Sequence, residues 1–516
     1  MTFKVKALVV SLFMGIKSVL SKPLASYVHK QTVKWSLKAG DTQKQVFDNL
    51  ITGGNNTLFG KDHGFKEIRS FKEFSNQVPI RDYEGLKPYV DKIISGEKDI
   101  LWKGKPTYFA KTSGTTSGVK YIPITKDSMP NHINGAKNAL LSYVHHSGKS
   151  IFLDKKMMFL SGSPVLDTKG GIHFGRLSGI VNHHVPAYLK TNQKPTYDTN
   201  CIDDWEEKLD AVMAETLGQP MSLISGIPPW VQMYFDKIQE KTGKKIKDVF
   251  PDFSVFVYGG VNFDPYKAKL YDSIGKHIDS VETYPASEGF IAYQDNYEEE
   301  GLLMILNSGI FYEFIPADKY FDENPSRLTI EEVDLNVNYA VIINSNAGLW
   351  GYSIGDTVKF ISRDPYRVLV TGRIKHFISA FGEHVIGNEV EKAMNETVQQ
   401  FPETEIVEFT VAPSINPNKG QSRHQWYVSF ATPPHDLSAF GVILDRKICK
   451  LNSYYDDLIG GNILKTLEII PLQPTAFIEY MRSQGKLGGQ NKVPRLSNDR
   501  NIVNVLDQYR LVVKSL

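Results

Sequence analysis

The sequence is poor in the features that identify several common classes of protein. Only two of its 516 residues are cysteine, Cys201 and Cys449, which are too few and too far apart for a disulfide framework or a zinc knuckle. Its 59 Lys and Arg residues nearly balance its 57 Asp and Glu residues, which leaves a formal net charge of +2. That balance provides neither a general basic field for nucleic acid nor an acidic tail. The low cysteine content favours a reducing, cytoplasmic setting.

The chain also lacks an apolar run long enough to span a membrane. Lys4 and Lys6 precede an apolar stretch over residues 7–16, but Lys17 ends it well short of the ~20 residues that a bilayer requires. No cleavage site of small residues follows, so we do not expect a signal peptide. Met14 is an alternative start that would remove most of the stretch. We expect a cytoplasmic protein without stable membrane insertion and without a nucleic-acid partner.

Composition and length indicate a folded chain of several domains. The hydrophobic fraction of 41% and the charged fraction of 22% are typical of globular proteins. No internal repeat is visible, which argues against solenoids and propellers. Residues 1–75 are predicted to be helical. One buried helical face is expected to hold Trp35, Leu37, Val46, Phe47 and Leu50.

From about residue 155 the pattern alternates between short apolar runs and amphipathic segments. The expected strands are 157–160, 221–224, 253–258 and 280–283, and the expected helices are 205–217, 229–238 and 265–274. This alternation predicts a mostly parallel sheet covered by helices. Residues 302–360 instead hold short apolar runs separated by turn residues, which is typical of antiparallel or barrel-like structure.

The last part of the chain has the pattern of a separate, smaller domain. Its expected strands are 408–411 and 425–430, and its expected helices are 388–398 and 435–454. We place the boundary near Gly372, after the apolar run 368–370. The predicted fold class is α/β, with a large N-terminal domain over residues 1–371 and a small α+β C-terminal domain over residues 372–516. The large domain is expected to combine mixed, mostly parallel sheets with a β-barrel-like part.

The segment from Lys111 to Lys120 carries the clearest chemical signal. It contains five hydroxyl residues, two glycines and a terminal lysine. Glycine lets the backbone approach a phosphate closely, while N–H groups and hydroxyls donate to its oxygens. A flexible linker needs neither adjacent threonines nor the final lysine, and the spacing is not that of a Walker loop. The segment predicts phosphate binding by Thr112, Ser113, Gly114, Thr115, Thr116 and Lys120.

This segment resembles the phosphate loop of the adenylate-forming superfamily, which includes acyl-CoA synthetases, luciferase and peptide-synthetase adenylation domains. That loop runs Thr-Ser-Gly-Thr-Thr-Gly-x-Pro-Lys, whereas here Gly118 comes one place late and the proline is missing. Four further motifs follow in the superfamily's order: Tyr-Gly-Gly, Tyr-x-x-Ser-Glu, Tyr-x-x-Gly-Asp, and Gly-Arg with a later Gly-Glu. They lie at residues 258–260, 284–288, 352–356 and 372–383. Each motif is weak alone, but five in order are specific.

Three features together narrow the resemblance: the form Tyr-x-x-Ser-Glu, residues 377–383 and residues 491–495. They are similar to those of the auxin-responsive acyl-acid amido synthetases of plants and their bacterial relatives, which conjugate amino acids to carboxylic-acid hormones. The resemblance covers about residues 30–510. It implies a ligase that uses ATP and Mg²⁺ to adenylate a carboxylic acid. The acyl group would then pass to the amine of an amino acid, with release of AMP and pyrophosphate.

The resemblance also implies roles for individual residues. Glu288 would be a catalytic residue and the magnesium ligand at the ATP phosphates. Asp356 would accept hydrogen bonds from the ribose hydroxyls, with Arg373 near the ribose or phosphate. Lys492 would stabilise charge on the carboxylate and α-phosphate when the C-terminal domain closes about a hinge at Gly372. The remaining implied nucleotide contacts are Tyr258, Gly259, Gly260, Tyr284 and Ser287.

Each of these assignments has a purely structural alternative. Glu288 has the residue type of an ordinary exposed loop carboxylate, and Asp356 follows a glycine, as turn residues often do. Tyr258 and Tyr284 are of the residue type that fills cores. Arg373 has the alternative of an ordinary surface arginine. Lys486 is the rival of the catalytic lysine.

Two rival functions remain open from the sequence. A thiol acceptor would make the protein an acyl-CoA ligase, and loss of chemistry would leave a non-catalytic nucleotide-binding protein of the same fold. Intact acidic and basic motif residues argue against the second. The acyl pocket has no sequence signature, although residues 161–186 are plausible contributors.

Overall fold

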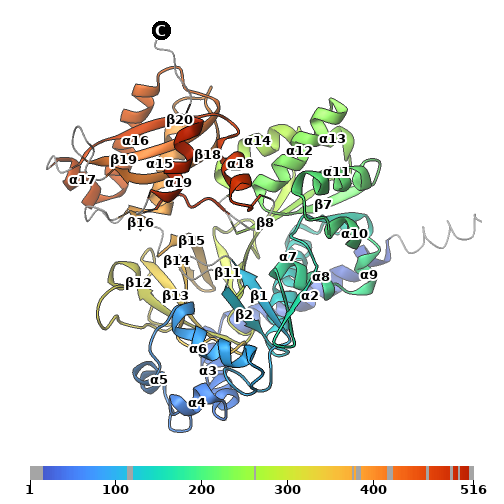
Figure 1. Ribbon diagram of the computed structural model, residues 1–516. Helices are drawn as coiled ribbons and strands as arrows, with labels where there is room; N and C mark the ends of the chain where they lie inside the picture. The colour runs from blue at the N-terminus through green and yellow to red at the C-terminus, as the bar shows by residue number, and fades with distance from the viewer. Residues whose placement is uncertain are drawn as a thin grey trace, which may run out of the picture. The chain divides into compact units, whose positions relative to one another are not determined.

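The computed structural model describes residues 15–112, 120–260, 263–374, 377–378, 385–414, 422–460, 464–487, 492–497 and 500–510 (Figure 1). The described chain divides into two units. The first runs to Ile354 and includes Val358–Leu369, and the second holds Gly355–Thr357 and the chain from Val370 onward. The change of unit therefore occurs at residues 369–370, within one strand.

The N-terminal region is helical, as predicted. Its helices are α2 (Ile16–Ser36), α3 (Ala39–Gly54), α4 (Leu58–Asp62), α5 (Phe71–Gln77) and α6 (Tyr83–Ile94). Val46, Phe47 and Leu50 of α3 are buried, as expected for one helical face. The prediction for Leu37 was wrong, because this residue lies in the turn between α2 and α3 and is 58% exposed. No helix in the part of the chain that the structure describes is long and apolar enough to cross a membrane.

The first unit is built on an 11-stranded sheet whose one half is parallel. That half runs in the order β9 (Asp279–Ala286), β8 (Val255–Gly259), β7 (Met221–Ser225), β3 (Lys156–Phe159) and β6 (Gln193–Lys194). The connecting helices include α11 (Trp205–Thr216), α12 (Pro228–Thr242) and α14 (Asp264–Ile274). The predicted strand–helix alternation is thus confirmed, with most ends displaced by one to three residues.

The other half of the sheet contains the strands expected to be antiparallel. It continues from β9 through β10 (Gly289–Tyr293), β11 (Leu302–Met304), β15 (Tyr366–Arg373), β14 (Tyr352–Arg363), β13 (Asn338–Ser345) and β12 (Ile310–Pro316). The β9–β10, β10–β11, β11–β15 and β12–β13 pairs are antiparallel. These strands share one continuous sheet with the parallel half, because β9 pairs with strands of both orientations.

A second, four-stranded sheet carries the predicted phosphate segment. Its order is β2 (Lys120–Ile124), β1 (Tyr108–Thr112), β5 (Ile172–Gly175) and β4 (Asp167–Lys169). Helix α7 (Met129–Ser147) follows β2 and packs against β9, β10 and α2. One long helix therefore links the hairpin of the small sheet to the central strands of the large one.

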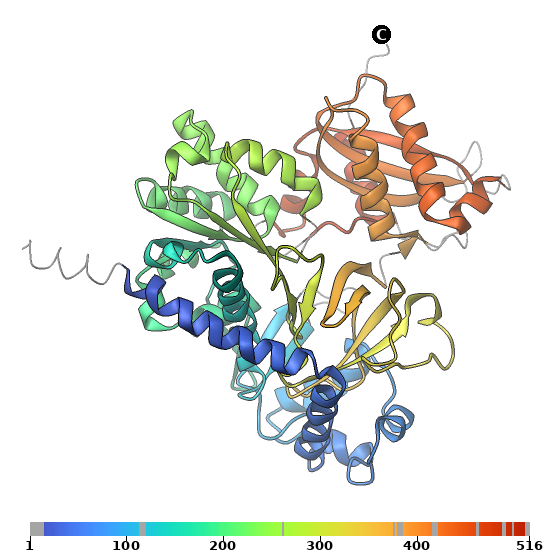
Figure 2. The ribbon, with the colours of Figure 1, turned by 180° about the vertical axis from the view of Figure 1, so that it is seen from behind.

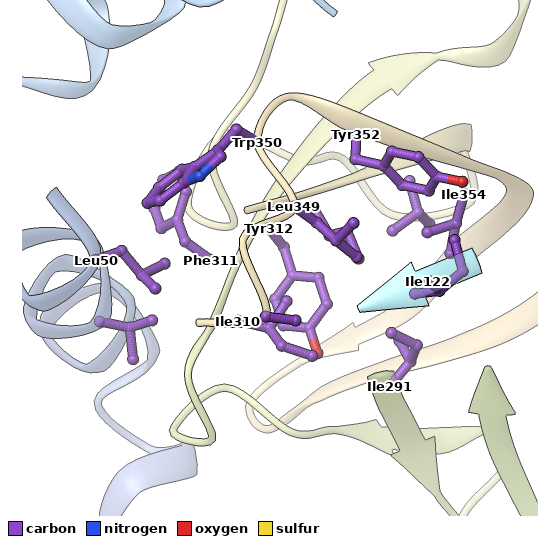
Figure 3. Packing of buried hydrophobic residues seen from close by; sticks show 14 of the residues in the cluster. Leu50, Ile122, Ile291, Ile310, Phe311, Tyr312, Leu349, Trp350, Tyr352 and Ile354 are labelled. Atoms are coloured by element: carbon purple, nitrogen blue, oxygen red, sulfur yellow. The ribbon is translucent and has the colours of Figure 1, made fainter. Parts of the chain in front are cut away.

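The main hydrophobic core of the first unit joins elements that are far apart in the sequence. In Figure 3, Leu50 of α3 lies on one side of Trp350 and of Tyr312 of β12. Ile122 of β2 and Ile291 of β10 lie on the other side in this view. Tyr312 and Trp350 are fully buried, and the Trp350 indole N–H donates to the carbonyl of Leu101 at 2.9 Å. Because that donor is satisfied, the large ring can be buried without a polar penalty.

The second unit is α+β, as predicted. Its three-stranded sheet is β18 (Glu405–Ser414), β19 (Arg423–Thr432) and β20 (Lys465–Leu472), and a two-stranded sheet pairs β16 (Phe377–Ile378) with β17 (Val385–Ile386). Its helices are α15 (Gly387–Val398), α16 (Leu437–Leu451), α17 (Ser453–Gly460), α18 (Ala476–Ser483) and α19 (Asn501–Leu506). The single helix predicted over residues 435–454 is in fact two. Asn452 is extended between them, and its side-chain oxygen accepts from the Tyr455 N–H at 2.8 Å, which starts α17.

A buried ion pair ties the antiparallel strands to the N-terminal helices. Glu313 of β12 is fully buried, and both its carboxylate oxygens accept from the Arg327 guanidinium, Nη2 to Oε1 at 2.7 Å. Asn344 of β13 donates to the same oxygen at 2.7 Å. Arg327 also donates to the carbonyls of Ser75 and Val78 at the end of α5. Both charges are therefore paired and hydrogen-bonded, as burial requires.

Removing this carboxylate should unfold the first unit more easily. Glu313→Ala leaves the Arg327 cation buried without its acid. We expect the free energy of unfolding to fall by about 3–5 kcal/mol. Urea unfolding followed by tryptophan fluorescence measures the change in midpoint. The control is Lys44→Ala, which breaks the solvent-exposed Lys44–Asp48 pair of α3 and should leave the midpoint unchanged. Equal midpoints for both variants would contradict the structural role of the buried pair.

Candidate active site

The two ends of the predicted phosphate loop face each other at the neck of a β hairpin. β1 and β2 are antiparallel, and their last register pair joins Thr112 to Lys120. Both residues are half-buried. The predicted Ser113, Gly114, Thr115 and Thr116 lie outside the described residues. The structure therefore positions where this loop leaves the sheet and where it returns.

The predicted glycine turn follows β8 at the carboxyl edge of the parallel strands. Gly259 pairs with Thr283 of β9, and a Cβ atom on Gly259 would lie 2.3 Å from the Thr283 carbonyl oxygen. Only glycine fits this close approach. Gly260 has a φ of +78°, which glycine adopts without strain. The two glycines thus serve the joint between β8 and β9, and they leave a backbone edge without side chains where parallel sheets bind ligands.

The two tyrosines that the resemblance implies as nucleotide contacts are both held in packed surroundings. Tyr258 is 9% exposed, its ring lies 4.5 Å from that of Phe263, and its hydroxyl donates to Glu282 at 3.4 Å. Tyr284 of β9 is 5% exposed and belongs to the main hydrophobic core. The two rings therefore help to fix β8 and β9, and contact with adenine stays a prediction for both.

Glu288 lies in the turn that ends β9. Ser287 and Glu288 form the turn between β9 and β10, and both side chains are half-buried. The side chain of Asn131 in α7, which is 4% exposed, is hydrogen-bonded to the strand that follows this turn. Its amide oxygen accepts from the Phe290 N–H at 2.7 Å, and its amide nitrogen donates to the Phe290 carbonyl at 3.1 Å and to Ser308 at 2.7 Å. Asn131 thereby fixes the first residues of β10 and, through them, the position of Glu288.

Sequence reasoning missed Asn131. The residue sits in the first turn of α7, two positions after Met129, and no motif surrounds it. Its role depends on β10, which lies more than 150 residues further along the chain. An asparagine at a helix start is ordinarily read as a local cap, so the sequence holds no signal of this contact.

Asp356 and Arg373 are brought together in the second unit. Asp356 lies on β14 and Arg373 ends β15, with Arg373 Nε 2.9 Å from Asp356 Oδ1. Asp356 is 19% and Arg373 49% exposed, so the pair lies at the surface of its unit. Gly355 has a φ of +80°, and its carbonyl accepts from the Ile374 N–H at 2.7 Å. The Gly-Asp motif therefore places a glycine of positive φ directly before Asp356, whose carboxylate meets the arginine.

Lys492 begins a segment that is pinned to β18. The Val411 N–H donates to the Arg495 carbonyl at 2.9 Å, and Leu496 forms a parallel bridge with Val411. Arg495 pairs with Glu391 at 2.9 Å and also with Glu408. These contacts hold the residues that follow Lys492 against β18, so the backbone beside Lys492 is anchored to the second unit.

The charges around Lys492 come from other candidate residues of the same unit. Desolvation lowers the pKa of its ammonium to about 8, Asp356 and Glu391 raise it, and Arg373 lowers it. The side chain keeps an exposed surface, so water screens part of the desolvation. Lys492 is therefore cationic at neutral pH and within electrostatic reach of the Asp356–Arg373 pair.

The candidate residues thus form two groups, one in each unit. The first unit holds Thr112, Lys120, Tyr258, Gly259, Gly260, Tyr284, Ser287 and Glu288. The second holds Asp356, Arg373 and Lys492. Among the described residues, no group of three or more His, Cys, Asp or Glu side chains is arranged to hold a metal ion. A single carboxylate such as Glu288 suits Mg²⁺, which takes one or two carboxylates together with phosphate oxygens.

Models of one protein family match most of the chain. The GH3 family N-terminal domain matches residues 28–223, the central domain residues 303–372 and the C-terminal domain residues 388–501. A jasmonoyl–L-amino acid synthetase of Nicotiana attenuata, JAR4, is 23% identical over an alignment of 389 positions, which covers 62% of this chain and 66% of that protein. The indole-3-acetic acid-amido synthetase GH3.4 of Arabidopsis thaliana is 20% identical over an alignment of 584 positions, which covers 96% of this chain and 96% of that protein.

Two kinds of solved structure share the fold. The GH3.15 acyl acid amido synthetase in complex with 2,4-DB has a TM-score of 0.78 at 15% identity, over 94% of this chain and 96% of that one. A 2-hydroxyisobutyryl-CoA ligase in the postadenylation state has a TM-score of 0.57 at 12% identity, over 91% of this chain and 92% of that one. At these identities the structures establish the fold alone. The expected fold of the adenylate-forming superfamily is confirmed.

Asn131 should be a positioning residue for the Glu288 turn. Asn131→Ala removes three hydrogen bonds and leaves the Phe290 N–H and carbonyl without them. We expect ATP affinity, measured by titration calorimetry on the folded protein, to fall about tenfold, which corresponds to 1.4 kcal/mol. Asn134→Ala, at an exposed position of the same helix, is the matched control and should bind ATP normally. Unaltered ATP affinity in Asn131→Ala would limit Asn131 to packing.

Proposed function

Because this chain belongs to the GH3 family, we propose that it is an acyl-acid amido synthetase acting on a carboxylic acid, ATP and an amino acid. In the first half-reaction a carboxylate oxygen attacks the α-phosphorus of ATP, which gives an acyl-adenylate and pyrophosphate. In the second, the amine nitrogen attacks the acyl carbon, AMP leaves, and the nitrogen loses a proton. The product is an amide, so the protein is a ligase that forms a carbon–nitrogen bond.

The observation that carries this proposal is the charge group of the second unit. Asp356 and Arg373 pair at 2.9 Å, and both act on the Lys492 ammonium. Each residue was predicted from a different motif, yet the three share one electrostatic neighbourhood. A carboxylate can accept from two ribose hydroxyls. Two cations offset the negative charge that builds up as a carboxylate meets a phosphate.

In the first unit we propose that the nucleotide lies at the ends of β8 and β9. Gly259 and Gly260 present backbone without side chains there, and Ser287 and Glu288 flank the same edge. Mg²⁺, when bound, neutralises part of the charge on the phosphate oxygens, and Glu288 is the proposed carboxylate ligand. The segment between Thr112 and Lys120 would wrap the phosphates.

We also propose that the C-terminal part, residues 372–516, moves relative to residues 1–371. Gly372 has a φ of +148°, a conformation that side chains disfavour, and it lies in β15 shortly after the change of unit at residues 369–370. A hinge there would let Lys492 approach during adenylation and withdraw during acyl transfer. A cytoplasmic location is part of the same proposal, because the reaction consumes ATP.

A substrate screen identifies the molecule that accepts the acyl group. Pyrophosphate release with a library of carboxylic acids tests adenylation, and addition of amino acids or of CoA tests the second half-reaction. Amide products support the proposal, whereas a thioester would identify an acyl-CoA ligase. Absence of pyrophosphate release with every acid would leave only nucleotide binding and overturn the proposal.

Glu288→Gln should separate magnesium binding from folding. The amide keeps the size of the side chain but loses the charge that the metal requires, so magnesium-dependent adenylation should fall at least about a hundredfold. Pyrophosphate release over a series of magnesium concentrations measures the loss. Glu299→Gln, an exposed glutamate beyond β10, is the control and should behave as the wild type. A folded Glu288→Gln protein with normal adenylation would refute the metal assignment.

Lys492→Ala should affect the two half-reactions unequally. Loss of one charge stabiliser should slow adenylation about 10²–10³-fold. Amide formation from a separately supplied acyl-adenylate should be nearly unchanged, because the hinge withdraws the lysine for that step. Lys486→Ala is the matched control. Equal losses in both half-reactions would contradict the hinge, and a loss in Lys486→Ala alone would reassign the lysine.

The same lysine predicts a pH dependence. The ammonium is present below its pKa, which desolvation holds below the ordinary value, and it is lost as the pH rises through that pKa. Adenylation should therefore decline on the alkaline side of that pKa. Lys492→Arg keeps its charge to a much higher pH, so the residual activity of that variant should lack this decline. An identical alkaline limb in both proteins would assign the titration to another group.

A further inference from the structure

Helix α2 turns its large apolar side chains toward solvent and its small side chains toward the protein. The residues of α2 that are buried are Ser18, Ser21, Ala25, Thr32 and Ser36. By contrast, Val19 is 67%, Leu20 62% and Tyr27 61% exposed. An amphipathic helix of a globular protein ordinarily has the opposite arrangement. The anomaly therefore concerns a whole helix surface and not one isolated residue.

Five of the six large exposed apolar residues of α2, all but Val33, form one stripe, which we call the outer face of α2. Their spacing of three to four residues places them on the same side of a helix. Figure 2 shows α2 (blue) on the outside of the first unit, with no other element of that unit lying over it in this view. The outer face consists of Ile16, Val19, Leu20, Leu24 and Tyr27. The neighbouring short helix η1 (Ile151–Asp154) adds Ile151, which is 69% exposed.

The charged side chains of α2 itself have one sign. The first 40 residues of the sequence contain seven lysines and no aspartate or glutamate. Lys22, Lys30 and Lys34 of α2 are exposed. The acid nearest the start of the helix is Asp154 of η1, which accepts a hydrogen bond from the Ser18 N–H at 3.3 Å. The face thus combines an apolar stripe with a cationic border, as interfacial helices do.

We propose that the outer face of α2 binds the surface of an anionic lipid bilayer, with the helix lying in the plane of the interface. The apolar stripe would enter the boundary between headgroups and acyl chains, and the lysines would meet the lipid phosphates. A second copy of the chain complements this surface poorly. Packing two α2 helices together would bring lysines toward lysines, and α2 has no acidic residue to pair with them. The proposal does not depend on the proposed function.

The test is co-flotation of the full-length protein with vesicles. Vesicles of phosphatidylcholine containing phosphatidylglycerol should carry the protein upward, and vesicles of phosphatidylcholine alone should carry much less. Salt at about 1 M shortens the screening length to ~3 Å and should weaken binding to the anionic vesicles. Absence of flotation with anionic vesicles, or equal flotation with both kinds, would overturn the proposal.

Two sets of variants separate the apolar and the cationic contributions. Val19→Gln with Leu20→Gln should weaken vesicle binding about tenfold or more, because each apolar side chain that leaves water contributes favourable free energy to binding. Val442→Gln, an exposed apolar residue on α16, is the matched control. Lys22→Glu with Lys30→Glu should weaken binding to anionic vesicles about fivefold or more per lysine. Lys72→Glu on α5 is the control for charge.

Oligomeric state supplies the remaining decision. Sedimentation equilibrium of the wild type and of the Val19→Gln, Leu20→Gln double variant should give the same mass. If the wild type is a dimer and this double variant is a monomer, the outer face joins two copies and the bilayer proposal is wrong. Thermal unfolding shows whether each variant is folded. If the Val19→Gln, Leu20→Gln double variant is unfolded, vesicle binding by the Lys22→Glu, Lys30→Glu double variant decides alone. Unchanged vesicle binding in folded variants of both kinds would also overturn the proposal.

Discussion

Strand β9 is the constraint on which the candidate site of the first unit depends. It pairs in parallel with β8 and antiparallel with β10, and so joins the two halves of the 11-stranded sheet. On one side Gly259 approaches the Thr283 carbonyl so closely that no side chain fits between them. On the other side Asn131 holds the first residues of β10. The glycine edge and the Glu288 turn are therefore fixed beside each other by backbone geometry, before any ligand is considered.

Several residues of the site motifs also stabilise the fold. Tyr258 and Tyr284 are packed aromatics, and Gly259 is required by strand pairing. Their residue types alone thus do not distinguish a structural from a chemical role, because the same glycine or ring satisfies both. The charged residues differ. Asp356, Arg373 and Lys492 lie at the surface of the second unit, where a charge cluster contributes little to stability.

Helix α2 shows where periodicity stops being informative. The sequence predicts that residues 1–75 are helical with one buried face, and the structure confirms a helix over Ile16–Ser36. Periodicity can indicate an apolar stripe on a helix but carries no information on whether the stripe faces the protein or the solvent. Small residues such as Ser18, Ser21 and Ala25 let α2 approach α7 closely, and the larger Val19 and Leu20 are left outside. The direction of a helix face is decided by what packs against it.

By itself the sequence determined the alternation of strands and helices, the α+β character of the last part, and the order of the motifs, because all three depend on local patterns. It also supplied Glu288, Asp356, Arg373 and Lys492 as candidates. Only the tertiary structure decided that β9 unites both halves of the sheet, that Asn452 divides a predicted helix in two, and that Asn131 supports the Glu288 turn. It likewise brought Asp356 against Arg373. The physical reason is that strand pairing and side-chain hydrogen bonds join residues that sequence periodicity does not relate, such as Asn131 and Phe290, which are 159 positions apart. Sequence patterns record only the periodicity of neighbours.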